Sequence, residues 1–128
     1  MGLPKECELQ LENRYARGEK NLITDVPGVR VGHVTLNDDD KDVHTGVTAV
    51  LPHSGNLFKD KVTAGVSVIN GFGKSTGLIQ VEELGTIETP IIMTNTFGVG
   101  TSLNALTKYM LERNEDIGVS TSTVNCMV

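Results

Sequence analysis

Two adjacent carboxylates, Glu82 and Glu83, are candidates for chemistry in this 128-residue sequence. They lie in the run Val-Glu-Glu-Leu-Gly, where apolar spacing over residues 76–84 predicts a short helix that Gly85 ends. Adjacent helical residues point about 100° apart, so at most one carboxylate can face a small pocket. That one would suit a substrate ammonium, because a charge-assisted hydrogen bond contributes about 1.5–3 kcal/mol. The alternative is a solvated helix face.

A glycine-rich segment, residues 70–77, follows a predicted strand and opens that helix. This is the context of phosphate-binding loops, because amides at a helix start point at the anion. The spacing does not fit, since a Walker A loop needs glycine at Val68 and a dinucleotide fingerprint needs it at Thr76. Nucleotide binding is therefore not expected. The glycines still imply that a ligand or neighbouring backbone approaches closely.

A polar run, Thr-Asn-Thr-Phe-Gly at residues 94–98, leaves a predicted buried strand. Strand ends followed by glycine turns are common places for catalytic donors. A turn capped by Asn and Thr side chains is the other interpretation.

The three histidines, His33, His44 and His53, follow no zinc-binding spacing. We expect surface or hydrogen-bonded histidines and no metal site. No G-x-S-x-G elbow is present, so no serine can be matched to a base from spacing alone.

Eleven basic and sixteen acidic residues give a net charge of −5, and the densest charge run, residues 38–40, is acidic. No basic patch and only 4% aromatic residues argue against nucleic-acid binding. No apolar run approaches the roughly 18 residues of a membrane span, and the first residues lack a secretory signal. Cys7 and Cys126 lie at opposite ends, and reduced thiols in a cytoplasmic protein are preferred to a bridge.

Alternation of apolar and polar residues predicts strands, with a hairpin-like loop at 37–42 and two helices. Residues 1–20 are expected to form a polar arm. The strands are expected at 29–36, 45–51, 62–69 and 90–95, the last buried on both faces, with a weaker one at 118–124. The helices are expected over 76–84 and around Leu103–Leu111, the second capped by Thr101 or Ser102. Large apolar anchors are scarce, so the chain is expected to be part of a larger body.

Five segments together resemble the DmpA family of self-processing aminopeptidases, which includes L-aminopeptidase/D-amidases, β-aminopeptidases and nylon-oligomer hydrolases. The match is specific because the five segments occur in order and run through nearly the whole chain from Asn21. They are NLITDVPGVRVGHVTL, TGVTAVLPHSGNLF, NGFGK, VEELGTIETPIIMTN and the closing TVN.

The resemblance implies an α+β fold: the front part of an α/β/β/α sandwich, like N-terminal-nucleophile hydrolases but with different connectivity. Residues 21–128 would be this incomplete single domain. Family members are precursors that cut themselves into α and β chains, and the new N-terminal Ser or Thr is the nucleophile. The resemblance implies no cofactor, a peptide or amino-acid amide or ester as substrate, and a homo-oligomer of αβ units.

Carried over to this sequence, the resemblance implies that Glu82 holds the free amino group of the substrate. The backbone N–H of Leu84 would help bind the oxyanion, where one preorganised donor is worth about 3 kcal/mol. Phe72 would wall the side-chain pocket, which Asn70 and Gly71 would shape. Phe97 stands where some relatives are expected to carry tyrosine, so a hydroxyl donor would be missing there.

The nucleophile of the family lies beyond Val128, so none of the serines here is expected to inherit its role. The chain would then be a fragment of the α chain, a partner for the rest of the α chain and the β chain, and inactive alone. A truncated, non-catalytic binding or assembly protein is the first alternative. Acyl transfer resembling the self-cleaving ornithine acetyltransferases is the second.

Overall fold

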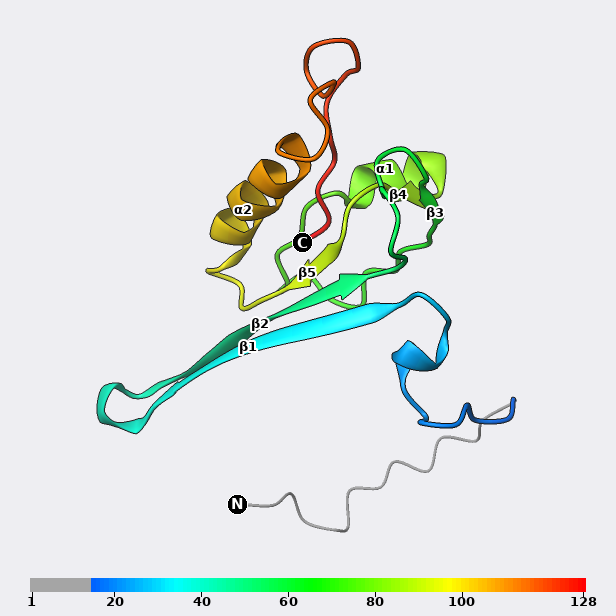
Figure 1. Ribbon diagram of the computed structural model, residues 1–128. Coiled ribbons are helices and arrows are strands. Elements are labelled where there is room, and N and C mark those ends of the chain that lie inside the picture. Colours follow the sequence, from blue (N-terminus) through cyan, green and yellow to red (C-terminus); the bar gives the residue numbers. More distant parts are fainter. Residues whose placement is uncertain (1–14) are drawn as a thin grey trace.

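The computed structural model describes residues 15–128, and Figure 1 shows their arrangement. Its regular elements are strands, two α-helices and two short 3-10 helices. In chain order they are η1 (Ile23–Asp25), β1 (Arg30–Asp38), η2 (Asp39–Lys41), β2 (Val43–Leu51), β3 (Val62–Thr63), α1 (Leu78–Leu84), β4 (Thr86–Ile87), β5 (Ile91–Met93) and α2 (Val99–Leu111).

The longest strands, β1 and β2, form an antiparallel hairpin whose register runs from Arg30 opposite Leu51 to Asp38 opposite Val43. β5 pairs antiparallel with the other edge of β2, giving a sheet in the order β1-β2-β5, and β3 pairs with β4 in a separate two-stranded sheet. The predicted hairpin is confirmed, with both strands slightly longer than expected. The turn closes through η2 and Asp42, which adopts a left-handed conformation at φ 52°.

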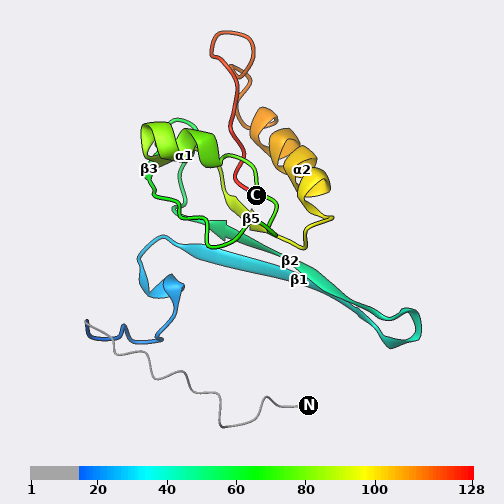
Figure 2. The ribbon, with the colours of Figure 1, turned by 180° about the vertical axis from the view of Figure 1, so that it is seen from behind.

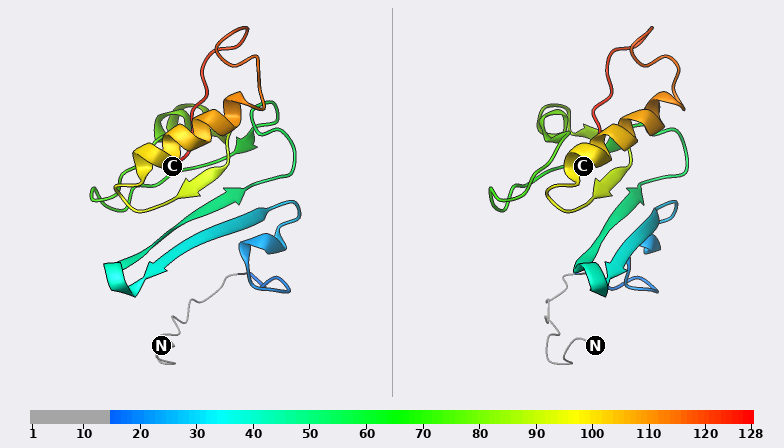
Figure 3. Two further views of the ribbon diagram at one scale, coloured as in Figure 1. Left: turned by 60° about the vertical axis from the view of Figure 1, so that its left-hand side comes forward. Right: turned by 90° about the vertical axis from the view of Figure 1, so that its left-hand side faces the viewer.

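Helix α2 lies over one face of this sheet, as Figure 3 shows from two sides. Its buried residues Leu106 and Met110 pack with Ile117 and Cys126 to form the core, and Phe58 and other partly buried side chains surround them. The spacing of Leu103, Leu106, Met110 and Leu111 predicts one apolar face, and the first three pack in the core, whereas Leu111 is 45% exposed. The distal part of the β1–β2 hairpin extends past both helices, which Figure 2 shows from behind.

Two predicted strands are wrong in extent. Only Val62–Thr63 of the segment 62–69 is a strand, because β4 offers a two-residue partner, and Ile69 is 94% exposed. Segment 118–124 is not a strand: the carbonyl of Asp116 accepts hydrogen bonds from three successive amides, those of residues 119–121, and folds this segment into a turn. A segment of alternating apolar and polar residues forms a strand only where a partner strand supplies the hydrogen bonds.

Three smaller expectations also differ from the structure. β5 is not buried on both faces, because Met93 is more than half exposed. Helix α2 begins at Val99 with Gly98 as its N-cap, so neither Thr101 nor Ser102 caps it. The short strand β4 is not among the predicted strands. The overall class, α+β, is as expected.

Residues 1–14 of the predicted polar arm, and Cys7 with them, lie outside the described residues. Within residues 15–128, no helix is both long enough and apolar enough to cross a membrane.

Candidate functional site

Helix α1 presents the two adjacent carboxylates to solvent. Its one buried residue is Val81, and the helix ends at Gly85, whose φ of 64° is a left-handed conformation that glycine adopts without a Cβ clash. Glu82 and Glu83 are both exposed. Leu84 is the last helical residue, and the regular α-helical pattern directs its N–H to the carbonyl of Gln80.

The glycine-rich segment before α1 meets the backbone of its own chain. A Cβ added at Gly77, where φ is 83°, would lie 2.8 Å from the carbonyl oxygen of Cys126. Nothing lies within 4 Å of the corresponding positions at Gly71 and Gly73. The close approach expected from these glycines therefore occurs at Gly77, and neighbouring backbone makes it.

The loop that resembles the family's pocket wall is open. The amide of Phe72 donates to Asn70 Oδ1 at 3.0 Å, which fixes a tight turn around Gly71. Lys74 Nζ donates to the carbonyl of Phe72 at 3.3 Å. The ring of Phe72 is largely exposed, so the described residues leave one side of it free.

The polar run after β5 forms a capped turn. Asn95 Oδ1 accepts hydrogen bonds from the amides of Phe97, at 3.0 Å, and Gly98, at 2.8 Å. Its Nδ2 donates to Thr45 Oγ1 at 2.9 Å, which ties the turn to β2. Asn95 is thus occupied in the turn, and Phe97 is 98% exposed beside it.

The predicted site residues share one property, exposure, and the described residues do not enclose them. Clefts of about 410 to 510 Å³ lie elsewhere among the described residues, and other side chains line them. The residues concerned are Asn70, Gly71, Phe72, Glu82, Leu84 and Phe97.

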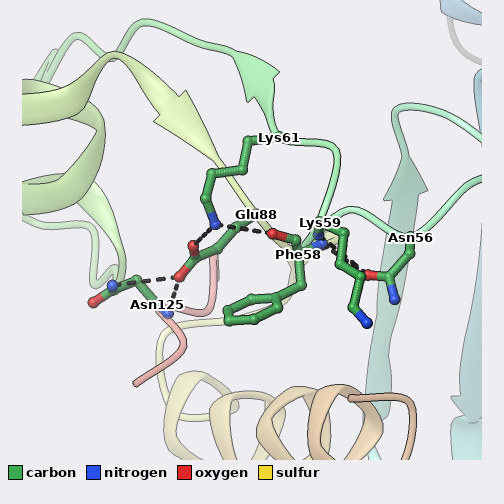
Figure 4. A network of polar contacts seen from close by, with 6 residues as sticks. All are labelled: Asn56, Phe58, Lys59, Lys61, Glu88 and Asn125. Atoms are coloured by element: carbon green, nitrogen blue, oxygen red, sulfur yellow. Dashed lines mark hydrogen bonds and ion pairs between the residues drawn. The ribbon is translucent and has the colours of Figure 1, made fainter. Parts of the chain in front are cut away.

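The structure contains a buried ionic network that the sequence analysis does not predict. Glu88, directly after β4, is 4% exposed and forms an ion pair with Lys61 (Figure 4). Its other carboxylate oxygen accepts from the backbone N–H of Asn125 at 2.8 Å and from Asn125 Nδ2 at 3.4 Å. Lys61 also donates to the carbonyl of Phe58 at 3.0 Å. The sequence does carry one sign of this network, because Glu88 is the single charged residue in the largely apolar run of residues 86–93.

The charge state of Glu88 follows from these contacts. Burial by itself raises the pKa of the Glu88 carboxyl, but the hydrogen bonds from Lys61 and Asn125 and the charge of Lys61 outweigh it, so the pKa lies below its ordinary value. Burial raises the pKa of the Cys126 thiol, and the nearby charge of Glu88 acts in the same direction. Glu88 is therefore a charged structural anchor at neutral pH, and Cys126 is a protonated core residue.

The same region fixes residues 125–128. The hydroxyl of fully buried Thr89 accepts from the amide of Met127 at 3.1 Å, and the amide of Ile92 donates to the Met127 carbonyl at 3.0 Å. Thr76 donates from its hydroxyl to the Cys126 carbonyl at 2.8 Å. Residues 125–128 consequently lie alongside β5, and Met127 forms a parallel bridge with Ile91.

The histidines make the hydrogen bonds that were expected of them. His33 Nδ1 lies 2.8 Å from Thr48 Oγ1, His44 contacts Asn37, and His53 Nε2 lies 2.8 Å from the carbonyl oxygen of Asp60. Within residues 15–128, no three His, Cys, Asp or Glu side chains are grouped as metal ligands would be.

Comparison with known proteins gives a consistent result. Residues 21–128 match Peptidase family S58. The beta-peptidyl aminopeptidase BapA of Sphingosinicella microcystinivorans is 38% identical over 116 residues, covering 85% of this chain and 29% of the relative. BapA of Sphingosinicella xenopeptidilytica is 39% identical over 104 residues, covering 76% and 26%. The chain thus spans less than a third of the length of these curated relatives.

Solved structures show the same partial coverage. The PH0078 protein of Pyrococcus horikoshii superposes with a TM-score of 0.85 at 55% identity, over 91% of this chain and 35% of that chain. A Burkholderia beta-aminopeptidase gives 0.76 at 43%, over 88% and 32%. The L-aminopeptidase D-Ala-esterase/amidase of Ochrobactrum anthropi gives 0.74 at 31%, over 88% and 33%, and its structure is a variant of the Ntn hydrolase fold. The described residues adopt part of that variant fold.

Proposed function

This chain belongs to peptidase family S58, the DmpA family, and on that premise we propose that it is part of an aminopeptidase-type hydrolase. The proposed reaction cleaves an amide or ester bond next to a free amino terminus, and the substrate is a peptide or an amino-acid amide or ester. The match of residues 21–128 to the family carries this proposal. The names of the relatives support it, since they are aminopeptidases from four organisms.

In the proposal, Glu82 binds the substrate ammonium. Its carboxylate is exposed on α1. Other parts of the complete protein would form a pocket over this helix, and the carboxylate would face the substrate in that pocket. Val81, one position earlier, is buried and holds the helix against the body, so the carboxylate would be presented from a fixed element. Glu83 points about 100° away and serves as its natural control.

The backbone N–H of Leu84 is proposed to bind the oxyanion. Because the helical pattern directs this N–H to the Gln80 carbonyl, the role requires the amide to be shared between that carbonyl and the substrate oxygen. Such three-centre bonds are common at helix ends, and α1 ends here. Phe72, Asn70 and Gly71 are proposed to line the substrate side-chain pocket, with Phe97 as an apolar neighbour.

The nucleophile is proposed to come from outside these 128 residues, as the new amino-terminal Ser or Thr of a self-processed precursor. Its hydroxyl oxygen would bond to the substrate carbonyl carbon while its own amine takes the proton, and the leaving amine would then receive that proton. Water would hydrolyse the acyl-enzyme. The chain alone would be inactive. Assembly into homo-oligomers, a cytoplasmic location and a domain beginning at residue 21 complete the proposal.

The test compares E82Q with E83Q in the complete reading frame, using aminoacyl p-nitroanilides. Losing a charge-assisted hydrogen bond worth about 1.5–3 kcal/mol predicts a fall in kcat/KM of roughly 10- to 150-fold for E82Q. E83Q should leave kcat/KM within about twofold. An N-acetylated substrate should not distinguish the two variants. Equal effects of both substitutions would refute the role of Glu82.

Self-processing is tested separately on the same preparation. The unmodified reading frame should yield two bands, and intact mass should place a Ser or Thr at the start of the second. A single uncut chain without activity on any aminoacyl p-nitroanilide would refute the hydrolase and favour a non-catalytic assembly protein.

A further inference from the structure

Helix α1, which carries the proposed substrate-binding carboxylate, is held at its start by residues 125–128. The hydroxyl of Thr76 donates to the carbonyl of Cys126 at 2.8 Å, and the Thr76 amide donates to the carbonyl of Val128 at 2.9 Å. Gly77, the N-cap of α1, lies so close to this segment that an added Cβ would be 2.8 Å from the Cys126 carbonyl oxygen. The position of residues 125–128 therefore sets where the helix begins.

The other end of α1 is joined to the small sheet of β3 and β4. Gly85, which follows the helix, accepts a hydrogen bond at its carbonyl from the amide of Ala64 at 2.8 Å. Lys61 directly precedes β3 and Glu88 directly follows β4, so their ion pair lies beside the same sheet. The ion pair and Gly85 are therefore at the two ends of one short pair of strands.

Glu88 connects these two attachments of the helix. One of its carboxylate oxygens pairs with Lys61 beside β3, and the other accepts from the backbone N–H of Asn125 at 2.8 Å (Figure 4). Burial raises the pKa of Glu88, and the side chain of Gln80, on α1, is among the donors that lower it. One buried carboxylate therefore contacts the sheet that follows α1 and the segment that holds the start of α1.

Within residues 15–128, α1 depends on these attachments because few of its own side chains are packed. Val81 is its one buried residue among the described residues. A short helix held by one apolar side chain shifts readily when the contacts at one end are lost. In a substrate site, a displacement of about 1 Å can cost roughly 100-fold in rate. The placement of α1 therefore matters for any ligand that Glu82 binds.

We propose that Glu88 is a positioning residue for Glu82. Its carboxylate fastens residues 125–128 to the sheet of β3 and β4, and this segment fixes the start of the helix from which Glu82 reaches the substrate. Glu88 is 4% exposed, so it acts through α1 and does not itself contact the substrate. The inference rests on the proposed function and adds a residue to the same site. Unlike a purely structural role, it predicts that Glu88 and Glu82 are energetically coupled.

A double-mutant cycle with E88Q and E82Q tests this coupling in the complete reading frame. Glutamine at position 88 has one acceptor oxygen, so it can serve Lys61 or the Asn125 amide but not both. E88Q should lower kcat/KM for aminoacyl p-nitroanilides at least roughly tenfold. In the E82Q background its effect should be at least about threefold smaller, because what remains acts only through the Leu84 amide. Equal factors in the two backgrounds, or full activity of E88Q, would overturn the proposal.

Two further variants separate positioning from a general loss of stability. T76V removes the hydroxyl that donates to the Cys126 carbonyl and leaves the ion pair intact, and it should show the same coupling with E82Q. G46A is the matched control, because an added Cβ would lie 2.6 Å from the Val34 carbonyl oxygen and disturb the β1–β2 hairpin. Neither attachment of α1 involves this hairpin, so G46A should change kcat/KM by the same factor in both backgrounds.

Hydrogen–deuterium exchange on the same proteins gives a readout that does not depend on activity. In E88Q, the amides of α1 and of residues 125–128 should exchange at least roughly threefold faster, while those of the β1–β2 hairpin keep their rates. If E82Q has no effect on activity, the proposed function is wrong, and the exchange still decides whether Glu88 holds α1. Unchanged exchange of α1 in an E88Q protein that circular dichroism shows to be folded would refute the inference.

Discussion

Replacing Glu88 by glutamine removes one negative charge from the buried network and keeps the shape of the side chain. The side-chain carbonyl of the introduced glutamine could still accept the hydrogen bond from the Asn125 amide. Its amide nitrogen, however, is a donor and cannot pair with the ammonium of Lys61. The variant E88Q therefore isolates the charge of Glu88 from its volume.

The magnitude follows from the exposure of the two partners. A hydrogen bond to a charged group contributes about 1.5–3 kcal/mol, and breaking a buried pair costs about 3–5 kcal/mol when the remaining charge stays buried. The Lys61 side chain is 40% exposed, so water can solvate its charge after the substitution. We expect E88Q to lower the free energy of unfolding by about 2 kcal/mol at pH 7, or Tm by roughly 8 °C.

Replacing Lys61, the other partner of the ion pair, should lower the free energy of unfolding further. K61M leaves the Glu88 carboxylate buried without a cationic partner, held by neutral donors such as Asn125, and we expect a loss of about 3–4 kcal/mol. Without the lysine, burial should dominate and raise the pKa of Glu88. The penalty of K61M should therefore shrink as pH falls and Glu88 takes up a proton.

The pH dependence of E88Q has a defined sign. Because the folded-state pKa of Glu88 lies below its ordinary value of 4.5, its stabilising contribution is complete above pH 4.5 and is lost as pH falls through the folded pKa. The stability difference between the unmodified chain and E88Q should therefore be constant from pH 7 to about 5 and then decrease.

Urea denaturation followed by circular dichroism, repeated from pH 7 down to pH 3, measures the free energy of unfolding of E88Q and of K61M against pH. Limited proteolysis reports whether residues 125–128 detach in the variants. A gap between the unmodified chain and E88Q that does not change with pH would refute the reasoning. So would a K61M variant more stable at pH 7 than E88Q.

Three further predictions concern the core, two glycines and the buried thiol. M110A should cost about 2–5 kcal/mol because Met110 is 2% exposed, whereas L111A, at the exposed neighbour, should cost less than about 1 kcal/mol in the same urea titration. G85A should cost about 1–2 kcal/mol because φ is 64°, while G100A, which meets no atom within 4 Å in α2, should be neutral or stabilising by thermal melts. Alkylation mapped by mass spectrometry should leave Cys126 unmodified until urea unfolds the chain, since its thiol is buried and its pKa is raised; labelling under native conditions would contradict this.

Local patterns in the sequence were sufficient for the hairpin and for α2. The alternation over 29–36 and 45–51 matches β1 and β2, because each strand finds its partner across a short turn. The apolar spacing of Leu106 and Met110 identifies the buried face of α2. Gly85 ends α1 as expected, because only its own backbone angles are involved.

The failures involve contacts between distant parts of the chain. Residues 64–69 alternate like a strand, yet β4 provides only two partner residues, and a strand needs its hydrogen bonds satisfied by another. In the sequence Glu88 is one acidic residue among sixteen, and only folding brings Lys61 and Asn125 to it from 27 and 37 positions away.

The ordered motifs of the sequence determined the family, which the comparisons confirm, and they pointed to Glu82 and Leu84. Tertiary structure alone decided that these residues face solvent, that Gly77 is packed against Cys126, and that the charge at Glu88 is buried. The reason is physical: a motif records which residues a site needs, whereas exposure and pairing depend on every segment that packs around them.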